Sequence, residues 1–247
     1  MSVNKFLCIA FLCTFNSYSA VVVEHIDTKN KIATVKIVEE IQYEEEHIFK
    51  RELDTLDAEG YKLKLNAIQL NTPGGNRFSA MAIGKLIRER KLNTYVAKDS
   101  RCGSACIFVV SGGLVRMVYG TVTVHRPSLG EGMRINSVEK FLTQGDEEMA
   151  QHIQQMGLSM LVTDAIVMTP HWAYRELNEQ ELRRWGVNAT DRMFEEMWFR
   201  NTAIQTKHSL DEVRDIFDKN ISACTKMPKR FEMTLWECIR LKVNTIN

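Results

Sequence analysis

Segments of strand character alternate with segments of helical character along most of this chain, and this alternation constrains its fold more than any other feature. The strand-like segments are Lys31–Ile41, Leu63–Leu70, Thr94–Ala97 and Thr121–Val124, and the helix-like segments between them are Glu44–Leu56, Met81–Lys91 and Ser104–Val110. Turn residues such as Gly112 and Gly113 separate several of them. Strands that alternate with helices predict an α/β fold with a largely parallel sheet.

The first twenty residues depart from this pattern and have the character of an export signal. An apolar run, Phe6–Phe15, follows a lysine and is followed by small polar residues. The run is shorter than the roughly 20 residues that span a bilayer, so a membrane anchor is the weaker interpretation. Small side chains are needed at the first and third residues before the cleaved bond. Cleavage after Ser19 puts Ser19 and Ser17 at these positions, whereas cleavage after Ala20 puts the bulky Tyr18 third from the cleaved bond. We therefore expect a signal peptide cleaved near Ser19 or Ala20, and an exported, periplasmic protein.

The charge of the chain argues against partners that are bound through a strong electrostatic field. Its 32 basic and 31 acidic residues give a formal net charge of +1, so we expect no nucleic acid or anionic lipid as a partner. The acidic run Glu44–Glu46 is most simply the solvated start of a helix.

A chain of 247 residues can form one sizeable core and a small appendage. Helical character runs from Ser137 to about Thr169, and Asn178–Trp185 has the pattern of a capped helix. Beyond it, Ser209–Glu212 fits a capping box and Phe231–Leu241 predicts a further helix. The predicted organisation is a signal peptide at 1–19, an α/β domain at 20–189 and a helical C-terminal extension at 190–247.

Four cysteines remain once the signal peptide is removed, and export makes disulfides the expected state of these residues. The pairing favoured by sequence distance is Cys102 with Cys106 and Cys224 with Cys238, although four cysteines allow three connectivities. A zinc site needs two close pairs, and Cys224 and Cys238 are too far apart for one. We expect no metal and no cofactor.

The first of three segments that fit acyl-transfer chemistry is the turn that follows the strand ending at Leu70. Its consecutive glycines, Gly74 and Gly75, let the main chain approach a ligand closely, so that an N–H can face a carbonyl oxygen. An ordinary Pro-Gly-Gly turn is the alternative.

The second segment surrounds Ser104 with Gly103 and Ala105 at a predicted helix start, as in a nucleophile elbow. The N–H of Ala105 then provides an oxyanion donor at the positive end of the helix. A simple N-cap role for the serine is the alternative, and a cysteine nucleophile, Cys102 or Cys106, is a weaker one.

The third segment places His125 at the end of the strand Thr121–Val124. Parallel α/β sheets gather their functional groups at the carboxyl ends of their strands, and all three segments fall at such ends. The sequence therefore predicts that His125 reaches Ser104 and acts as a general base.

Together, these segments resemble the Clp protease proteolytic subunit. The order LNTPGGN, a helix with AMAIGKLI, C-G-S-A-C, a Gly-Gly stop and V-H-R-P follows that family's N-S-P-G-G, small-Ser-small and H-Q-P pattern over Lys31 to Ala189. The resemblance implies a spiral of β-β-α units with the crotonase-like fold and a homo-oligomer, often a ring. It also implies that Ser104 is the nucleophile, His125 the base, and the amides of Gly74 and Ala105 the oxyanion hole.

One position departs from the family pattern, because Tyr174 stands where the family has the aspartate of its triad. Asp164, Asp99, Tyr174 or a water molecule are alternatives for orienting the imidazole, and a Ser-His dyad is another. Loss of the orienting carboxylate in a serine protease can reduce turnover by about 10⁴-fold.

We therefore expect an exported serine peptidase that acts on peptides or unfolded proteins without ATP and without an ATPase partner. The alternative is a catalytically weak or inactive protein of the same fold that binds an extended peptide as an added strand. A crotonase-type enzyme acting on acyl-coenzyme A is less favoured, since coenzyme A is cytosolic.

Overall fold

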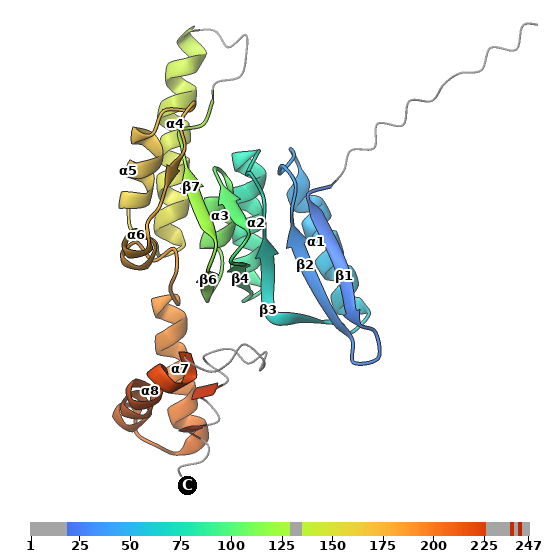
Figure 1. Cartoon of the computed structure of the whole chain (residues 1–247), viewed down its shortest axis with the longest axis vertical. Helices are drawn as coiled ribbons and strands as arrows, with labels where there is room; N and C mark the ends of the chain where they lie inside the picture. Colours follow the sequence, from blue (N-terminus) through green and yellow to red (C-terminus); the bar gives the residue numbers. More distant parts are fainter. Residues whose placement is uncertain (1–18, 129–134, 226–237, 240–241, 244–247) are drawn as a thin grey trace, which may run out of the picture.

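The computed structural model of this chain describes residues 19–128, 135–225, 238–239 and 242–243. The strands are β1 (Val21–Asp27), β2 (Ile32–Ile37), β3 (Lys62–Leu70), β4 (Asn93–Val96), β5 (Arg101–Gly103), β6 (Arg116–Val118), β7 (Thr121–Val124) and β8 (Arg175–Glu176). The helices are α1 (Glu45–Ala58), α2 (Arg77–Glu89), α3 (Cys106–Ser111), α4 (Ile135–Gln155), α5 (Leu161–Met168), α6 (Glu179–Arg184), α7 (Arg192–Thr206) and α8 (Leu210–Thr225) (Figure 1).

The strands form two sheets that share a repeating unit. The larger sheet has the order β1-β2-β3-β4-β6, with β2, β3, β4 and β6 parallel and β1 antiparallel at one edge. The smaller sheet has the order β5-β7-β8, with β5 and β7 parallel. The units β4-β5-α3 and β6-β7-α4 each contribute one strand to each sheet. The expected α/β spiral of β-β-α units, with helices following it, is confirmed.

Helices pack against these sheets around one apolar core. In Figure 1, α1 lies behind the β1-β2 hairpin, and α4 extends past the end of the sheet. The core includes Phe49 of α1, Ile83 of α2, Ile107 of α3 and Met149 of α4, all fully buried. These residues come from the apolar faces of amphipathic segments, which is why their periodicity predicted helices.

Several short strands were not predicted from the sequence. The elbow at Ser104 is preceded by β5, a strand of the second sheet, and not by the predicted strand at Thr94–Ala97, which corresponds to β4 of the first sheet. Strands β5, β6 and β8 contain only two or three residues, too few to display an alternating pattern.

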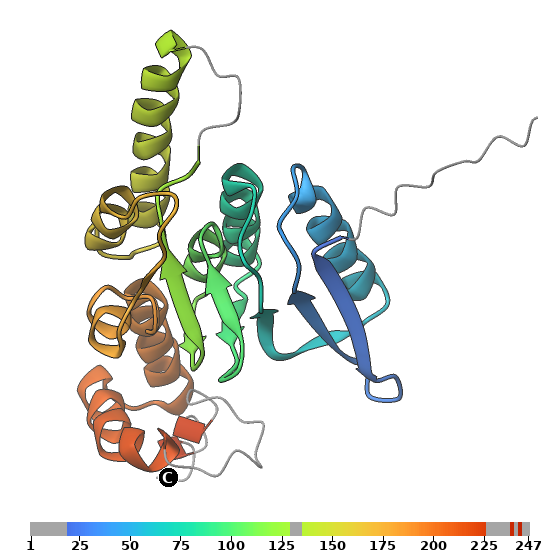
Figure 2. The same cartoon turned by 45° about the horizontal axis from the view of Figure 1, so that its top comes forward.

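Helices α7 and α8 form a second, smaller core (Figure 2). It includes Phe199, Val213 and the disulfide-bonded pair Cys224 and Cys238. It is joined to the rest of the chain by the ion pair of Arg88 with Asp191, 2.8 Å between Nη1 and Oδ2, where Asp191 also caps α7.

Both predicted capping boxes are present. The Asn178 side chain accepts from the N–H of Glu181, and the Ser209 hydroxyl accepts from the N–H of Glu212. Most of the helix predicted at Phe231–Leu241 and nearly all of the predicted signal peptide lie outside the described residues. Among the helices that are described, none is long and apolar enough to cross a membrane.

Candidate active site

Strand register brings the three sequence segments together. Thr72, just after β3, pairs with Cys102 of β5, and Cys102 pairs with Val122 of β7, all in parallel. The carboxyl ends of these three neighbouring segments, β3, β5 and β7, therefore lie side by side. Gly74 follows the first, Ser104 the second and His125 the third. The prediction that these segments meet at carboxyl strand ends is confirmed.

Ser104 has a left-handed backbone conformation, with φ at 51°. This conformation is unfavourable for a residue with a side chain and occurs at strained functional turns, including nucleophile elbows. The N–H of Ser104 donates to the carbonyl of Thr123 in β7 at 2.8 Å, which ties the elbow to the strand that carries His125.

The disulfide between Cys102 and Cys106 brackets the elbow from both sides. Both residues are fully buried, one in β5 and the other at the start of α3. The predicted pairing is therefore present in the structure. The alternative of a nucleophilic Cys102 or Cys106 is wrong for this state, because neither has a free thiol.

Gly74 packs directly against the elbow. A Cβ atom on it would lie 2.4 Å from the carbonyl oxygen of Gly103 and 2.9 Å from Cβ of Ser104, and its φ of 104° is one that residues with a side chain rarely adopt. The N–H of Gly74 donates to Oγ1 of Thr72 at 3.0 Å. Within the described part of the chain, the N–H groups of Gly75 and Ala105 have no protein acceptor. Gly75, and not Gly74, is therefore the glycine with a free donor.

The ring of His125 is oriented by the main chain. Its Nδ1 lies 2.9 Å from the carbonyl oxygen of Arg126. A carbonyl can only accept, so Nδ1 carries the proton and the neutral ring has its lone pair on Nε2. Pro127 restricts Arg126 to extended conformations, and the N–H of Arg126 donates to the carbonyl of Thr169 at 2.8 Å. These two restraints fix the position of the accepting carbonyl.

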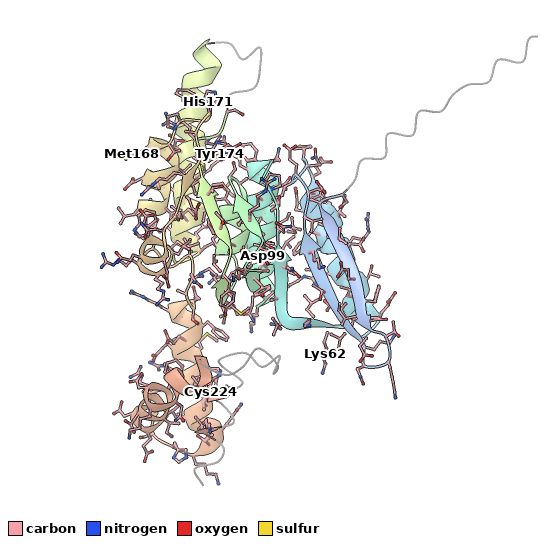
Figure 3. All side chains as sticks on the ribbon, in the orientation of Figure 1. Lys62, Asp99, Met168, His171, Tyr174 and Cys224 are labelled. Atoms are coloured by element: carbon pink, nitrogen blue, oxygen red, sulfur yellow. A yellow bond between two sulfur atoms is a disulfide. The ribbon has the colours of Figure 1, made fainter. Side chains whose placement is uncertain are left out.

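Tyr174 contacts His125 edge to face, with ring centroids 4.9 Å apart. Tyr174 is 70% exposed. Asp164 is exposed on α5 and Asp99 is exposed in the turn after β4, and neither lines the cavity that contains His125. Figure 3 shows Asp99 well apart from Tyr174. The structure brings only the tyrosine of these three candidates to the histidine.

A cavity of about 500 Å³ contains Ser104, Ala105, His125 and both glycines. Its apolar lining comes from Phe78, Phe108, Met149 and Ile166, and its charged lining from Glu40 and Arg77. Burial lowers the pKa of Arg77, while Glu148 and Asp146 oppose that shift. The cavity is half-enclosed, and polar and apolar groups contribute about equally to its lining.

Sequence reasoning missed Thr72 and the carbonyl of Arg126. The hydroxyl of Thr72 accepts from Gly74 and donates to the carbonyl of Glu39 at 2.6 Å, so it holds the glycine turn. The proline after Arg126 was a signal that could have drawn attention to its carbonyl.

In the described ranges, no group of three or more His, Cys, Asp or Glu side chains is arranged to hold a metal ion.

No model of a known protein family matches the chain, and no curated protein sequence matches it. Among solved structures, the chain is similar to a mutant form of the 1510-N membrane-bound stomatin-specific protease, with a TM-score of 0.44 and 16% sequence identity. The similarity covers 66% of this chain and 81% of that chain.

Proposed function

We propose that this protein is an exported serine hydrolase that cleaves peptides or unfolded polypeptides without ATP. The observation that carries the proposal is the cavity in which a strained serine elbow, a histidine of defined tautomer and two free main-chain N–H groups converge. An acyl-transfer enzyme needs these three elements: nucleophile, base and oxyanion donors.

The proposed reaction assigns one task to each group. Oγ of Ser104 attacks the carbonyl carbon of the substrate, and Nε2 of His125 takes the serine proton and later passes it to the leaving amine. The N–H groups of Gly75 and Ala105 stabilise the oxyanion. The carbonyl of Arg126 takes the place of the family's aspartate in fixing the tautomer, which makes the catalytic unit a Ser-His dyad.

Labelling with a fluorophosphonate tests the proposal, because this reagent reacts preferentially with an activated serine. The purified mature protein is expected to be labelled, and Ser104→Ala and His125→Ala are each expected to lose the label. Ser128→Ala is a matched control, since Ser128 lines the same cavity outside the elbow and its loss is expected to leave labelling unchanged. Labelling that survives in Ser104→Ala would refute the assignment.

The role of Tyr174 can be tested by separating its ring from its hydroxyl. Tyr174→Phe is expected to keep the labelling rate, because the contact with His125 is between rings. Tyr174→Ala is expected to lower the rate by up to about tenfold, since such a ring contact is worth about 0.5–1.5 kcal/mol. A large loss in Tyr174→Phe would instead make the phenol the partner of His125.

A second candidate function is that of a peptide-binding protein of low or absent activity. The observation that favours it is that no carboxylate among the described residues forms a hydrogen bond or ion pair with His125, which contacts the carbonyl of Arg126 and the ring of Tyr174. A folded wild-type protein that resists labelling but binds extended peptides would support this candidate.

A further inference from the structure

Glu45 is a buried carboxylate at the first turn of α1, with 1% of its surface exposed. This corrects the expectation that the whole run Glu44–Glu46 is solvated. The carboxylate accepts from the N–H of Ala20 at 3.0 Å, from the hydroxyl of Ser19 and from the N–H of Gln42 at 3.4 Å. Among the described residues, no lysine, arginine or histidine forms an ion pair with it. The partial positive charge of a helix N-terminus, about half a charge, is an incomplete compensation.

Ala20 is held in place by the sheet. It is fully buried in the main core, and its carbonyl accepts from the N–H of Val38 at 2.9 Å. Strand β1 begins at the next residue, where Val21 pairs with Ile37. These contacts of Ala20 and Val21 come from β2 and from Val38, which follows it, and they do not involve residues that precede Ala20.

We propose that removal of the signal peptide turns Ala20 into a buried amino terminus and that Glu45 is the site that binds it. Hydrolysis of the Ser19–Ala20 peptide bond by a signal peptidase consumes one water, leaving a carboxylate on Ser19 and an amine on Ala20. The amine takes up a proton near neutral pH, because α-amino groups have a pKa of about 8. The resulting ammonium has three N–H donors, which replace the amide and the departing hydroxyl and add a charge-assisted interaction.

The position of Glu45 distinguishes the two cleavage sites. Cleavage after Ser19 creates the amine where the carboxylate already accepts an N–H. Cleavage after Ala20 would create it at Val21, whose N–H donates to the Ser19 hydroxyl at 3.1 Å and to no carboxylate of the described chain. It would also remove Ala20 with the signal peptide, so that Glu45 would lose the N–H that donates to it. The buried carboxylate thus favours the first site on grounds independent of the small-residue pattern.

The amino-terminal site adjoins the segment that supports the glycine turn. Gln42, which donates to Glu45, follows Ile41, and the N–H of Ile41 donates to the carbonyl of Gly74 at 2.7 Å. The carbonyl of Ile41 accepts from the N–H of Asn76 at 2.7 Å. Any effect on catalysis through this segment rests on the proposed function, whereas binding of the amine by Glu45 does not.

The first test is amino-terminal sequencing of the exported protein. A mature chain that begins at Ala20 is the expected result. A chain that begins at Val21 or later, or one that keeps its leader, would overturn the proposal.

The second test compares chains that begin at Ala20 or at Ser19, each with Glu45 or with Glu45→Gln. Glutamine keeps the shape and an acceptor but removes the charge. The substitution is expected to lower the thermal midpoint by about 5 °C more in the Ala20 chain than in the Ser19 chain, because only the Ala20 chain loses a charge-assisted interaction between the ammonium and Glu45. Equal losses in both chains would show that Glu45 is only an acceptor for main-chain N–H groups and would overturn the proposal.

A third measurement needs no variant of Glu45, in case that variant does not fold. An aldehyde reagent selective for α-amines is expected to modify the folded Ala20 chain at least about tenfold more slowly than the unfolded chain, because the amine is buried and paired. Equal rates would overturn the proposal. All three readouts are independent of hydrolase activity, so a protein that fails to react with fluorophosphonate can still bind its amino terminus at Glu45.

Discussion

Gly74→Ala is expected to reduce fluorophosphonate labelling of Ser104 by at least about 100-fold, because small displacements in a catalytic site have effects of this size. The added Cβ would lie 2.4 Å from the carbonyl oxygen of Gly103 and 2.8 Å from the nitrogen of Ala105. Both are main-chain atoms of the elbow, so the clash cannot be relieved by rotating a side chain. Either the elbow or the glycine turn has to move, and the proposed oxyanion donors separate from the serine.

Gly60→Ala is the matched control for this substitution. Gly60 also has a positive φ, 75°, but an added Cβ there would meet nothing within 4 Å. It is therefore expected to cost only the backbone strain, about 1 kcal/mol, and to leave labelling unchanged. The thermal midpoints of both variants would show whether each is folded. A folded Gly74→Ala protein that is labelled as fast as the wild type would contradict the assigned geometry.

Acid is expected to destabilise the protein through His152, which is buried where α4 packs against α3. Its Nε2 lies 3.0 Å from both the Ser111 hydroxyl and the carbonyl oxygen of Phe108. Burial, together with the positive charges of Lys85 and Arg88 on α2, lowers the pKa of His152 from 6.5 to about 4, although the bond to Phe108 opposes this shift. The unfolded chain therefore takes up a proton at higher pH than the folded chain.

The sign of the effect follows from this difference. The contribution of neutral, buried His152 to the free energy of unfolding is fully present above pH 6.5 and is lost as the pH falls towards about 4. At about 1.4 kcal/mol for each pH unit, the free energy of unfolding decreases by about 3 kcal/mol across this interval. Urea unfolding at a series of pH values measures the loss.

His152→Gln should unfold with a weaker dependence on pH, because glutamine does not titrate and its amide can still donate to the carbonyl of Phe108. His47→Gln is the control, since the His47 side chain is 74% exposed and its loss should leave the wild-type dependence intact. Asp191 also contributes to the pH dependence: burial raises its pKa, but the hydrogen bond and ion pair with Arg88 outweigh this effect and lower it. Because both variants keep Asp191, the difference between their pH profiles reports His152 alone. Identical pH profiles in His152→Gln and wild type would contradict the prediction.

The parts of the fold that were predictable from sequence are those whose signals are local. The helices α1, α2 and α6 appear as apolar residues at helical spacing or as caps, and β3 and β7 as β-branched or apolar runs. The glycine turn, the elbow around Ser104 and the strand end at His125 are local signals too. Because parallel strands align their carboxyl ends, the sequence also predicted that these three segments meet.

The environments of individual side chains were decided only by the tertiary structure, because they depend on residues distant in sequence. Glu45 is buried because the β1-β2 hairpin brings Ala20 to the start of α1. The N–H of Gly74 is not free because it donates to the hydroxyl of Thr72. Nδ1 of His125 has the carbonyl of Arg126 as its acceptor, because Thr169 and Pro127 hold that carbonyl in place. By itself, the sequence determined which residues are candidates for the proposed chemistry and the strand ends on which they lie. The packing of remote segments determined which of their protons and charges are satisfied, since burial and hydrogen-bond partners are properties of the folded chain alone.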